Sequence, residues 1–241
     1  MADQVMNLGL SPCGSCPIHR WSIFAGLSTG DLQQLPMPVY DLQATRGTVL
    51  SHEGQPAATA FVVRSGVVKL EKTGPRETHL VQLLRSGDIW GFEGLDQSYY
   101  QHTATILENA HICSLEVTAL HQWCEQEPRV RQAIRMRLQQ AHQETENHLL
   151  LVLSASAELR VAGFLTRWCR DFPDGQKISL PLHREELASH LGMSTAHLSR
   201  IMAKFKRQHL IREQHGWIQV DYQRLRNLLF PEAEASDSDL G

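Results

Sequence analysis

The thiols of the cysteines are the most reactive side chains in this chain of 241 residues. Cys13 and Cys16 form a Cys-x-x-Cys pair, and the other three cysteines are Cys113, Cys124 and Cys169. A pair at this spacing can close a reversible disulfide or bind zinc with two further ligands, whereas a free buried cysteine is usually a small apolar residue. The pair alone therefore leaves three alternatives: a dithiol switch, a metal site, or inert thiols.

A second set of chemically competent residues lies between positions 194 and 207, where hydroxyl, imidazole and basic side chains recur. Arg200 can donate two parallel hydrogen bonds to O6 and N7 of guanine, and Ser199 can bond a base edge or contact a thymine methyl group. Basic residues later in the segment would meet phosphates. The residues expected to contact DNA are Ser194, Thr195, His197, Ser199, Arg200, Lys204, Lys206 and Arg207.

The elements that must position these side chains form a helix-turn-helix. The sequence predicts helices over residues 183–190 and 195–208, with Gly192 in the turn and Ser194 as the N-cap of the second helix. Apolar residues of the second helix recur at i, i+3, i+4 and i+7 and define a buried face opposite the basic face. They are Leu198, Ile201, Met202 and Phe205.

A β-hairpin is predicted directly after the second helix, over residues 211–220, with its turn at His215 and Gly216. A helix-turn-helix followed by such a hairpin is typical of a winged DNA-binding module, in which the second helix enters the major groove.

The segment from about 38 to 118 changes to short runs rich in Val, Ile, Leu and Thr, separated by glycines. The runs cover residues 48–54, 62–73, 79–87 and 102–116, a spacing that predicts a β-sandwich or β-barrel. Arg64–Val67 is expected to be a hairpin turn within one of these runs. Ahead of them, residues 24–36 predict a short helix that Ser28 caps.

A long helix is predicted from Pro128 to about Leu153, because the segment has no internal Gly or Pro and is rich in strong helix formers. At about 26 residues it would be roughly 39 Å long, more than a small barrel can cover. We therefore expect part of it to pack against a second copy, although an amphipathic helix lying on its own barrel is the alternative. The expected seam is Ile134, Leu138, Ala141, Thr145, His148 and Val152.

Composition and charge agree with this division of the chain. Residues 1–154 carry 11 basic and 15 acidic side chains, whereas residues 155–230 carry 12 basic and 7 acidic ones. A basic module attached to an acidic body suggests a polyanionic partner for the C-terminal part. The predicted domains are a cysteine-bearing segment (1–23), a β-barrel sensor domain (24–126), a dimerisation helix (127–154), a winged helix-turn-helix (155–230) and a disordered acidic tail (231–241).

Barrel, long helix and winged helix-turn-helix, in this order and at this length, resemble the Crp/Fnr family of bacterial transcription regulators over residues 22–228. The specific motifs are Ser86–Phe92 (SGDIWGF) and Leu191–Arg200 (LGMSTAHLSR). The resemblance implies an α+β fold with an N-terminal jelly-roll barrel like a cyclic-nucleotide-binding domain. It also implies a homodimer on a near-palindromic DNA site and a partnership with RNA polymerase.

The same resemblance bears on base recognition. In the family, a Glu, a Ser or Gly, and an Arg often read the half-site. Ser199 and Arg200 match the last two, but Ala196 stands at the position of the Glu. The acceptor that such a Glu offers to the amino group of cytosine or adenine is therefore missing.

The oxygen-sensing branch of the family, which this chain resembles most, holds a four-iron four-sulfur cluster on cysteine thiolates. The resemblance assigns Cys13, Cys16 and Cys113 to this site. The third N-terminal cysteine of the pattern is missing, so a fourth ligand would have to be His19 or Cys124. A thiol–disulfide change or a small non-nucleotide ligand in the barrel is the alternative signal.

Cyclic nucleotide binding is not expected. The cyclic-nucleotide branch anchors the phosphate with an Arg, and His102-Thr103-Ala104 stands at that position here. From Ser86 to Pro128 the sequence has no Arg or Lys. A buried phosphate without a cation is costly.

Other classes of protein lack support in the sequence. It has no Gly-rich phosphate loop, no HExxH and no GxSxG motif, so an enzyme is not expected. No apolar run approaches the length of a membrane span, and the N-terminus does not have the architecture of a secretory signal. We expect a cytoplasmic protein without a membrane partner.

Overall fold

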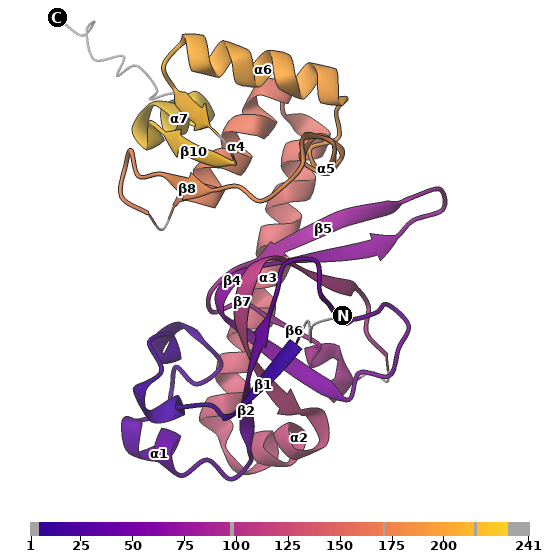
Figure 1. The fold of residues 1–241 in the computed structure, drawn as a ribbon, viewed down its shortest axis with the longest axis vertical. Coiled ribbons are helices and arrows are strands. Elements are labelled where there is room, and N and C mark those ends of the chain that lie inside the picture. The colour runs from indigo at the N-terminus through magenta and orange to yellow at the C-terminus, as the bar shows by residue number, and fades with distance from the viewer. Residues whose placement is uncertain (1–4, 97–98, 171, 215, 231–241) are drawn as a thin grey trace, which may run out of the picture. The chain divides into compact units, whose positions relative to one another are not determined.

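The computed structural model describes residues 5–96, 99–170, 172–214 and 216–230 (Figure 1). The chain divides into two compact units, residues 1–145 and residues 146–241, and the boundary falls within one long helix. The acidic tail 231–241, expected to be disordered, and His215 of the expected wing turn lie outside the described residues.

The N-terminal unit is built around one antiparallel sheet, with strand order β1-β2-β7-β4-β5; β3 also pairs with β7, and β6 with β4. The family's barrel fold expected from the sequence is confirmed, and β1 is a strand that the sequence patterns did not predict. The strands are β1 (Val5–Leu10), β2 (Val39–Ala44), β3 (Val49–Ser51), β4 (Thr59–Thr73), β5 (Thr78–Leu84), β6 (Ile89–Trp90) and β7 (Thr103–Glu116).

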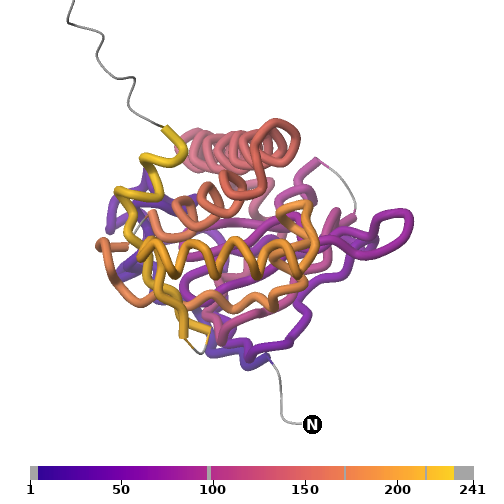
Figure 2. Tube along the Cα trace, turned by 90° about the horizontal axis from the view of Figure 1, so that it is seen from above, coloured from indigo at the N-terminus to yellow at the C-terminus, as the bar shows by residue number. Residues whose placement is uncertain are grey.

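The expectation of a hairpin turn at Arg64–Val67 is wrong. Strand β4 runs without a break through this segment, and its pairing with β7 is irregular on both sides of Ser65. Gly66 has a φ of 89°, and a Cβ there would lie 2.7 Å from the Cα of Ala110. The glycine is therefore needed for a bulge pressed against β7 and not for a turn. The chain reverses further on, and the β4–β5 hairpin projects from the sheet (Figures 1 and 2).

Short helices close one end of this unit. They are the 3-10 turns η1 (Cys13–Ser15), η2 (His19–Trp21) and η3 (Phe92–Leu95), and the helices α1 (Thr29–Gln33) and α2 (Val117–Gln126). Ser28 caps α1 as expected, in a capping box with Asp31. The core beneath them joins the N-terminal segment to the sheet: Phe24 lies 6.0 Å from Trp123 between ring centroids, and Cys13, Cys16 and Cys113 belong to the same buried cluster.

A second cluster of buried residues is formed mainly by side chains of the strands. In it Phe61 stacks on Trp90, with ring centroids 4.5 Å apart. The indole of Trp90 donates a hydrogen bond to the hydroxyl of Ser51, and the hydroxyl of Tyr100 donates to the carbonyl of Thr59 at 2.7 Å. Aromatic side chains thus occupy the space between the strands, and their polar ends are satisfied.

The long helix α3 spans Pro128–Ser154, in agreement with the predicted helix. Beyond it, the C-terminal unit contains helices α4 (Ala157–Cys169), α5 (Arg184–His190), α6 (Thr195–Arg207) and α7 (Tyr222–Leu229). Strands β8 (Ile178–Ser179), β9 (Ile211–Gln214) and β10 (Trp217–Val220) form a sheet in the order β8-β10-β9. The predicted helix-turn-helix and hairpin correspond to α5, α6 and β9–β10. Within the described residues, no helix is both long and apolar enough to span a bilayer.

Candidate functional site

The recognition-type helix α6 has one buried and one exposed face. Its four predicted inner residues, Leu198, Ile201, Met202 and Phe205, are buried in the C-terminal unit. The side chains at Ala196, Ser199, Arg200 and Arg207 are exposed on the other side. At 100° per residue, Ala196, Arg200 and Arg207 fall on one line along the centre of the exposed face. This line presents two guanidinium groups on the face that is available to a ligand.

The turn before α6 is fixed by hydrogen bonds from two directions. Ser194 caps α6 by accepting a hydrogen bond from the amide of His197 at 3.2 Å. The guanidinium of Arg160 on α4 donates to the carbonyls of Leu191 and Gly192 at 2.8 and 3.0 Å. Gly192 has a φ of 63°, the left-handed conformation that ends α5 and starts the turn. The orientation of α6 relative to α5 is therefore set by local contacts.

Several basic residues of the C-terminal unit form ion pairs with carboxylates of the same unit. These residues are less available to a ligand than the basic residues without an ion pair. Lys204 forms an ion pair with Glu158 of α4 at 2.6 Å. Lys206 pairs with Glu213 of β9 at 3.3 Å, and Arg184 of α5 pairs with the same carboxylate. Within the described parts of the chain, neither Arg200 nor Arg207 has an ion-pair partner. The sequence grouped the four cations of α6 together, because the spacing of residues in a helix does not show the carboxylates of other elements.

The predicted dimer seam on α3 needs a correction. Ile134 is only 4% exposed and packs in the core of the N-terminal unit, so it is not available to a partner helix. The ring of His148 stacks on His190 of α5, 4.1 Å away, and the methyl groups of Val152 face Gly192. Leu138 is exposed, whereas Ala141 is half-buried and accepts a hydrogen bond from the exposed Thr145. Ile134 is therefore wrong as a seam residue, and the other five residues of the seam stay predictions. The exposed large apolar residues of α3 are Met136, Leu138, Leu149, Leu150 and Leu153.

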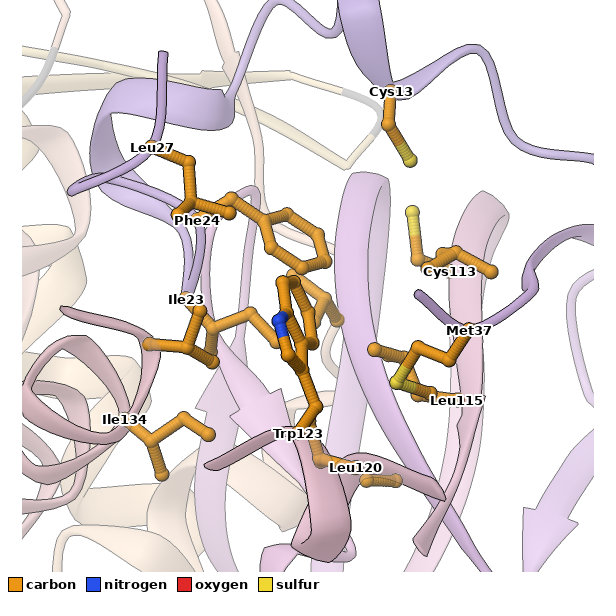
Figure 3. Packing of buried hydrophobic residues seen from close by; sticks show 14 of the residues in the cluster. Cys13, Ile23, Phe24, Leu27, Met37, Cys113, Leu115, Leu120, Trp123 and Ile134 are labelled. Carbon is orange, nitrogen blue, oxygen red and sulfur yellow. The ribbon is translucent and has the colours of Figure 1, made fainter. Parts of the chain in front are cut away.

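Three cysteines come together in the N-terminal unit although two segments far apart in sequence supply them. Cys13 begins η1, Cys16 follows it, and Cys113 lies on β7. The side chains of Cys13 and Cys113 point toward one another (Figure 3). All five cysteines are free and buried. The sequence resemblance grouped the three thiols, and the fold supports this grouping.

A polar network that the sequence did not reveal lies beside the thiols. The hydroxyl of Ser11 is 3.6 Å from the sulfur of Cys113, and Arg64 of β4 donates to this hydroxyl at 3.5 Å. Arg64 also forms an ion pair with Asp41 of β2, whose other carboxylate oxygen is 3.4 Å from His111. Four separate strands or segments contribute these groups, so no local pattern could have shown them.

The electrostatics of the cluster keep its thiols protonated. Burial raises the pKa of Cys13, and burial raises the pKa of Cys113 to about 12. The hydroxyl of Ser11 and the charge of Arg64 act in the opposite direction and lower the pKa of both thiols. Cys16 also raises the pKa of Cys13, and Cys13 and Cys16 raise the pKa of Cys113, which agrees with their closeness.

The two residues suggested as a fourth ligand lie in different surroundings. Nδ1 of His19 is 3.0 Å from the carbonyl of Cys16, so one ring nitrogen is engaged by the backbone. Burial raises the pKa of Cys124, and the charge of Arg131 lowers it. Among the described residues, no group of three or more His, Cys, Asp or Glu side chains could hold a metal ion.

His102, which stands at the position of the family's phosphate-anchoring Arg, has two acidic neighbours. Burial lowers the pKa of His102, while Glu93 and Glu53 raise it. The carboxylate of Glu93 accepts a hydrogen bond from the amide of Gln101 at 3.0 Å, and Lys72 is a nearby cation. Two carboxylates beside a neutral imidazole would repel a phosphate.

Comparison with known proteins agrees with both units. The Crp-like helix-turn-helix domain matches residues 159–228, and the cyclic nucleotide-binding domain matches residues 42–127. The transcriptional activator protein anr of Pseudomonas aeruginosa is 24% identical over 214 residues, which cover 86% of this chain and 88% of that protein. The anaerobic regulatory protein of Haemophilus influenzae is 24% identical over 218 residues, covering 87% and 84%.

The solved structure of FixK2 from Bradyrhizobium japonicum has the same fold, with a TM-score of 0.72 and 20% identity over 79% of this chain and 96% of that one. A cyclic-nucleotide-binding-type sheet, a long helix and a helix-turn-helix together define a transcription regulator with a DNA-binding domain. The chain belongs to the Crp/Fnr family of these regulators, and its relatives are regulators rather than enzymes.

Proposed function

We propose that the protein is a homodimer that binds a near-palindromic DNA site through α6 and is controlled by oxygen or redox state through Cys13, Cys16 and Cys113. The observation that carries the DNA proposal is the line of Arg200 and Arg207 along the exposed face of α6, in a helix whose buried face is fully packed. Two-fold half-sites about one helical turn apart, roughly 34 Å, would each receive one α6.

Within α6 the residues take different roles. Arg200 and Ser199 read base edges, and Thr195 and His197 flank them near the N-terminus of the helix. Arg207 and Ser194 contact phosphates, and Lys206 can join them only when it leaves its ion pair with Glu213. Lys204, which α4 already holds through Glu158, serves the fold of the module more than the DNA.

The dimer proposal is supported by the exposed apolar residues of α3. Leu149 and Leu153 are 55% and 74% exposed, and contiguous exposed leucines mark an interaction surface. A second copy of the same helix would cover them as in a coiled coil.

The redox proposal is supported by the three thiols that share one buried cluster and by the names of the relatives, one of which is an anaerobic regulatory protein. The thiols fit a four-iron four-sulfur cluster only in part. The chain brings three thiols together in one buried cluster, whereas a cubane cluster of this type is bound by four protein ligands. Cys13, Cys16 and Cys113 would be three of the ligands of such a cluster.

A protein partner and a cellular location complete the proposal. A regulator of this family recruits or contacts RNA polymerase, and it does so where DNA is accessible, in the cytoplasm. No cyclic nucleotide enters the proposal, because His102 replaces the phosphate-anchoring Arg of the cyclic-nucleotide branch and the charges of Glu53 and Glu93 act on it.

The experiment that tests DNA recognition compares Arg200→Ala with Arg226→Ala, an exposed arginine of α7. We expect Arg200→Ala to cost about 1–3 kcal/mol of specific binding, roughly 5- to 150-fold in Kd, because a bidentate contact to guanine is lost. Arg226→Ala should change the Kd less than twofold. The readout is binding to an operator selected from random DNA by the wild-type dimer. Equal affinities for wild type and Arg200→Ala would contradict the assignment of α6.

A further inference from the structure

We propose that the acidic tail, residues 231–241, docks on the exposed face of α6 and competes there with DNA. The occupant is a segment of this chain that lies outside the described residues, and the contacts it makes are to Arg200 and Arg207. The competition rests on the proposed role of α6 in DNA binding, whereas the contact itself does not. The tail thereby weakens binding to all DNA, and a good operator displaces it.

The tail carries charge of one sign. Its four carboxylates belong to Glu232, Glu234, Asp237 and Asp239, and it has no basic residue. The unit before it has the opposite balance, with 12 basic and 7 acidic side chains in residues 155–230. A run of carboxylates resembles a phosphate backbone in its charge, so the groups that attract DNA also attract the tail.

The exposed face of α6 offers two cations that no carboxylate of the described residues holds. Arg200 and Arg207 are exposed, and neither has an ion-pair partner in that part of the chain. The two lysines of the same helix already pair with carboxylates of α4 and β9. Seven residues separate the arginines, which places both on one side of the helix about 10.5 Å apart. An anionic segment therefore binds most favourably along this line.

Helix α7 lies beside the C-terminal end of α6, so the tail starts next to this face (Figure 1). Gln208, which directly follows α6, lines one pocket together with Arg224, Asn227 and Leu228 of α7. The described chain ends two residues after Leu228, at Phe230. The first carboxylates of the tail therefore follow within a few residues of the end of α6.

The length of the tail and the spacing of its carboxylates match the two arginines. An extended chain advances at most about 3.3–3.6 Å per residue, so the eleven residues of the tail can span roughly 36 Å. In the same conformation Glu234 and Asp237 would lie about 10 Å apart. This is close to the separation of about 10.5 Å between Arg207 and Arg200. We therefore assign Glu234 to Arg207 and Asp237 to Arg200.

A tethered segment competes even when its contacts are weak. Because the tail is part of the chain, its local concentration at α6 is on the order of millimolar. Exposed ion pairs are individually weak, so the docked and undocked forms are both populated and the tail does not abolish DNA binding. Salt also screens the contact. We therefore expect an effect of a few-fold on the Kd for DNA at low salt and none at high salt.

The contact is tested without DNA. A neutral-tail variant of the full-length protein carries Glu232→Gln, Glu234→Gln, Asp237→Asn and Asp239→Asn, which keep the length of the tail and remove its charge. We compare the amide NMR signals of the deuterated variant with those of the wild type at low salt. We expect differences along residues 195–207 that vanish in about 0.5 M salt. Differences confined to α7 and the tail would overturn the proposal.

The competition is measured in a thermodynamic cycle. The neutral tail should lower the Kd for an operator fragment about three- to tenfold at low salt. Simple repulsion between the tail and DNA would give the same gain, so the comparison is repeated in two further backgrounds. In Arg207→Ala the gain should shrink by at least half, because the tail has lost a partner. In Lys177→Ala, which removes an exposed lysine before β8, the gain should be unchanged. Equal gains in both backgrounds would show repulsion without docking and would overturn the proposal.

The two measurements separate this inference from the proposed function. If the signals of α6 respond to the tail and Arg200→Ala binds the operator as the wild type does, the docking contact stands and the role of α6 in base recognition fails. If Arg200→Ala loses specific binding and the signals of α6 do not respond to the tail, the proposed function stands and the docking contact fails.

Discussion

Arg160 of α4 donates hydrogen bonds to the carbonyl of Leu191 at 2.8 Å and to that of Gly192 at 3.0 Å, so one side chain closes the C-terminal end of α5. The carbonyls at the end of a helix have no intrahelical partner, and a guanidinium near them also interacts favourably with the helix dipole. This contact joins the scaffold helix to the turn that orients α6.

The first prediction concerns this contact. Arg160→Leu keeps much of the apolar stem but removes the charged donor, and hydrogen bonds to charged groups are worth about 1.5–3 kcal/mol each. We expect the free energy of unfolding to fall by about 2 kcal/mol and specific DNA binding to weaken, because α6 is less well held. Urea unfolding measures the first effect. Arg226→Ala is the control, and equal midpoints for both variants would show that the contact does not stabilise the turn.

The second prediction uses two glycines with similar backbone angles. Gly192 has a φ of 63°, and a Cβ there would lie 3.1 Å from the guanidinium of Arg160, whereas Gly175 has a φ of 73° with no atom within 4 Å. An alanine in the left-handed conformation costs about 1–2 kcal/mol at either position. Gly192→Ala should therefore lower the thermal midpoint more than Gly175→Ala does. Equal losses in a calorimetric comparison would mean that Arg160 and Val152 move aside without cost.

The third prediction concerns pH. Burial raises the pKa of Asp88 to about 6, and Glu144 of α3 adds to this, while the amide of Arg85 and the charges of Arg85 and Arg137 act against it. Because this pKa is higher in the folded than in the unfolded chain, the folded state binds the extra proton between about pH 4 and pH 6. The ionisation of Asp88 therefore lowers the free energy of unfolding as the pH rises through this window.

Asp88→Asn tests this directly, since the amide oxygen can still accept the hydrogen bond from the amide of Arg85, which is 2.8 Å in the wild type. We expect the variant to be stabilised relative to wild type at pH 8 and to lose this advantage at pH 4. The measurement is the thermal midpoint across this range. Asp96→Asn, an exposed carboxyl, is the matched control. An Asp88→Asn curve parallel to that of wild type would contradict the prediction.

Much of the fold could be predicted because its signals are local. The inner face of α6 follows from four apolar residues at helical spacing, and the caps at Ser28 and Ser194 follow from one polar residue before each helix. Gly66 shows the limit of local signals. A glycine between two β runs is compatible with a turn or a bulge, and only the nearby Ala110 of β7 decides for the bulge.

The site was less predictable, because its supporting groups come from distant segments. The three thiols could be grouped by resemblance, but Arg64 and Asp41 become their neighbours only when β2, β4 and β7 align. In the same way, Glu158 distinguishes Lys204 from Arg200, although both lie on α6. The spacing of residues in the sequence predicts which face of one helix is exposed. It does not predict which carboxylates of neighbouring elements lie beside that face.

The fourth prediction concerns the surface by which two copies would associate. Leu149 and Leu153 of α3 are exposed, so changing both to Glu removes no contact that the single chain needs. In a dimer whose helices pack along this face, two like charges per chain would be buried against each other, which is strongly unfavourable. We expect the Leu149→Glu, Leu153→Glu double variant to sediment as a monomer with unchanged secondary structure and with weak binding to a palindromic site. Asn147→Glu adds a charge at an exposed position about 120–160° around the same helix from the two leucines and should remain a dimer. Ile134→Glu gives the opposite contrast, since it places a charge in the core of the N-terminal unit and should unfold that unit. If the double variant stayed dimeric in analytical ultracentrifugation, the exposed leucines of α3 would not be the interface.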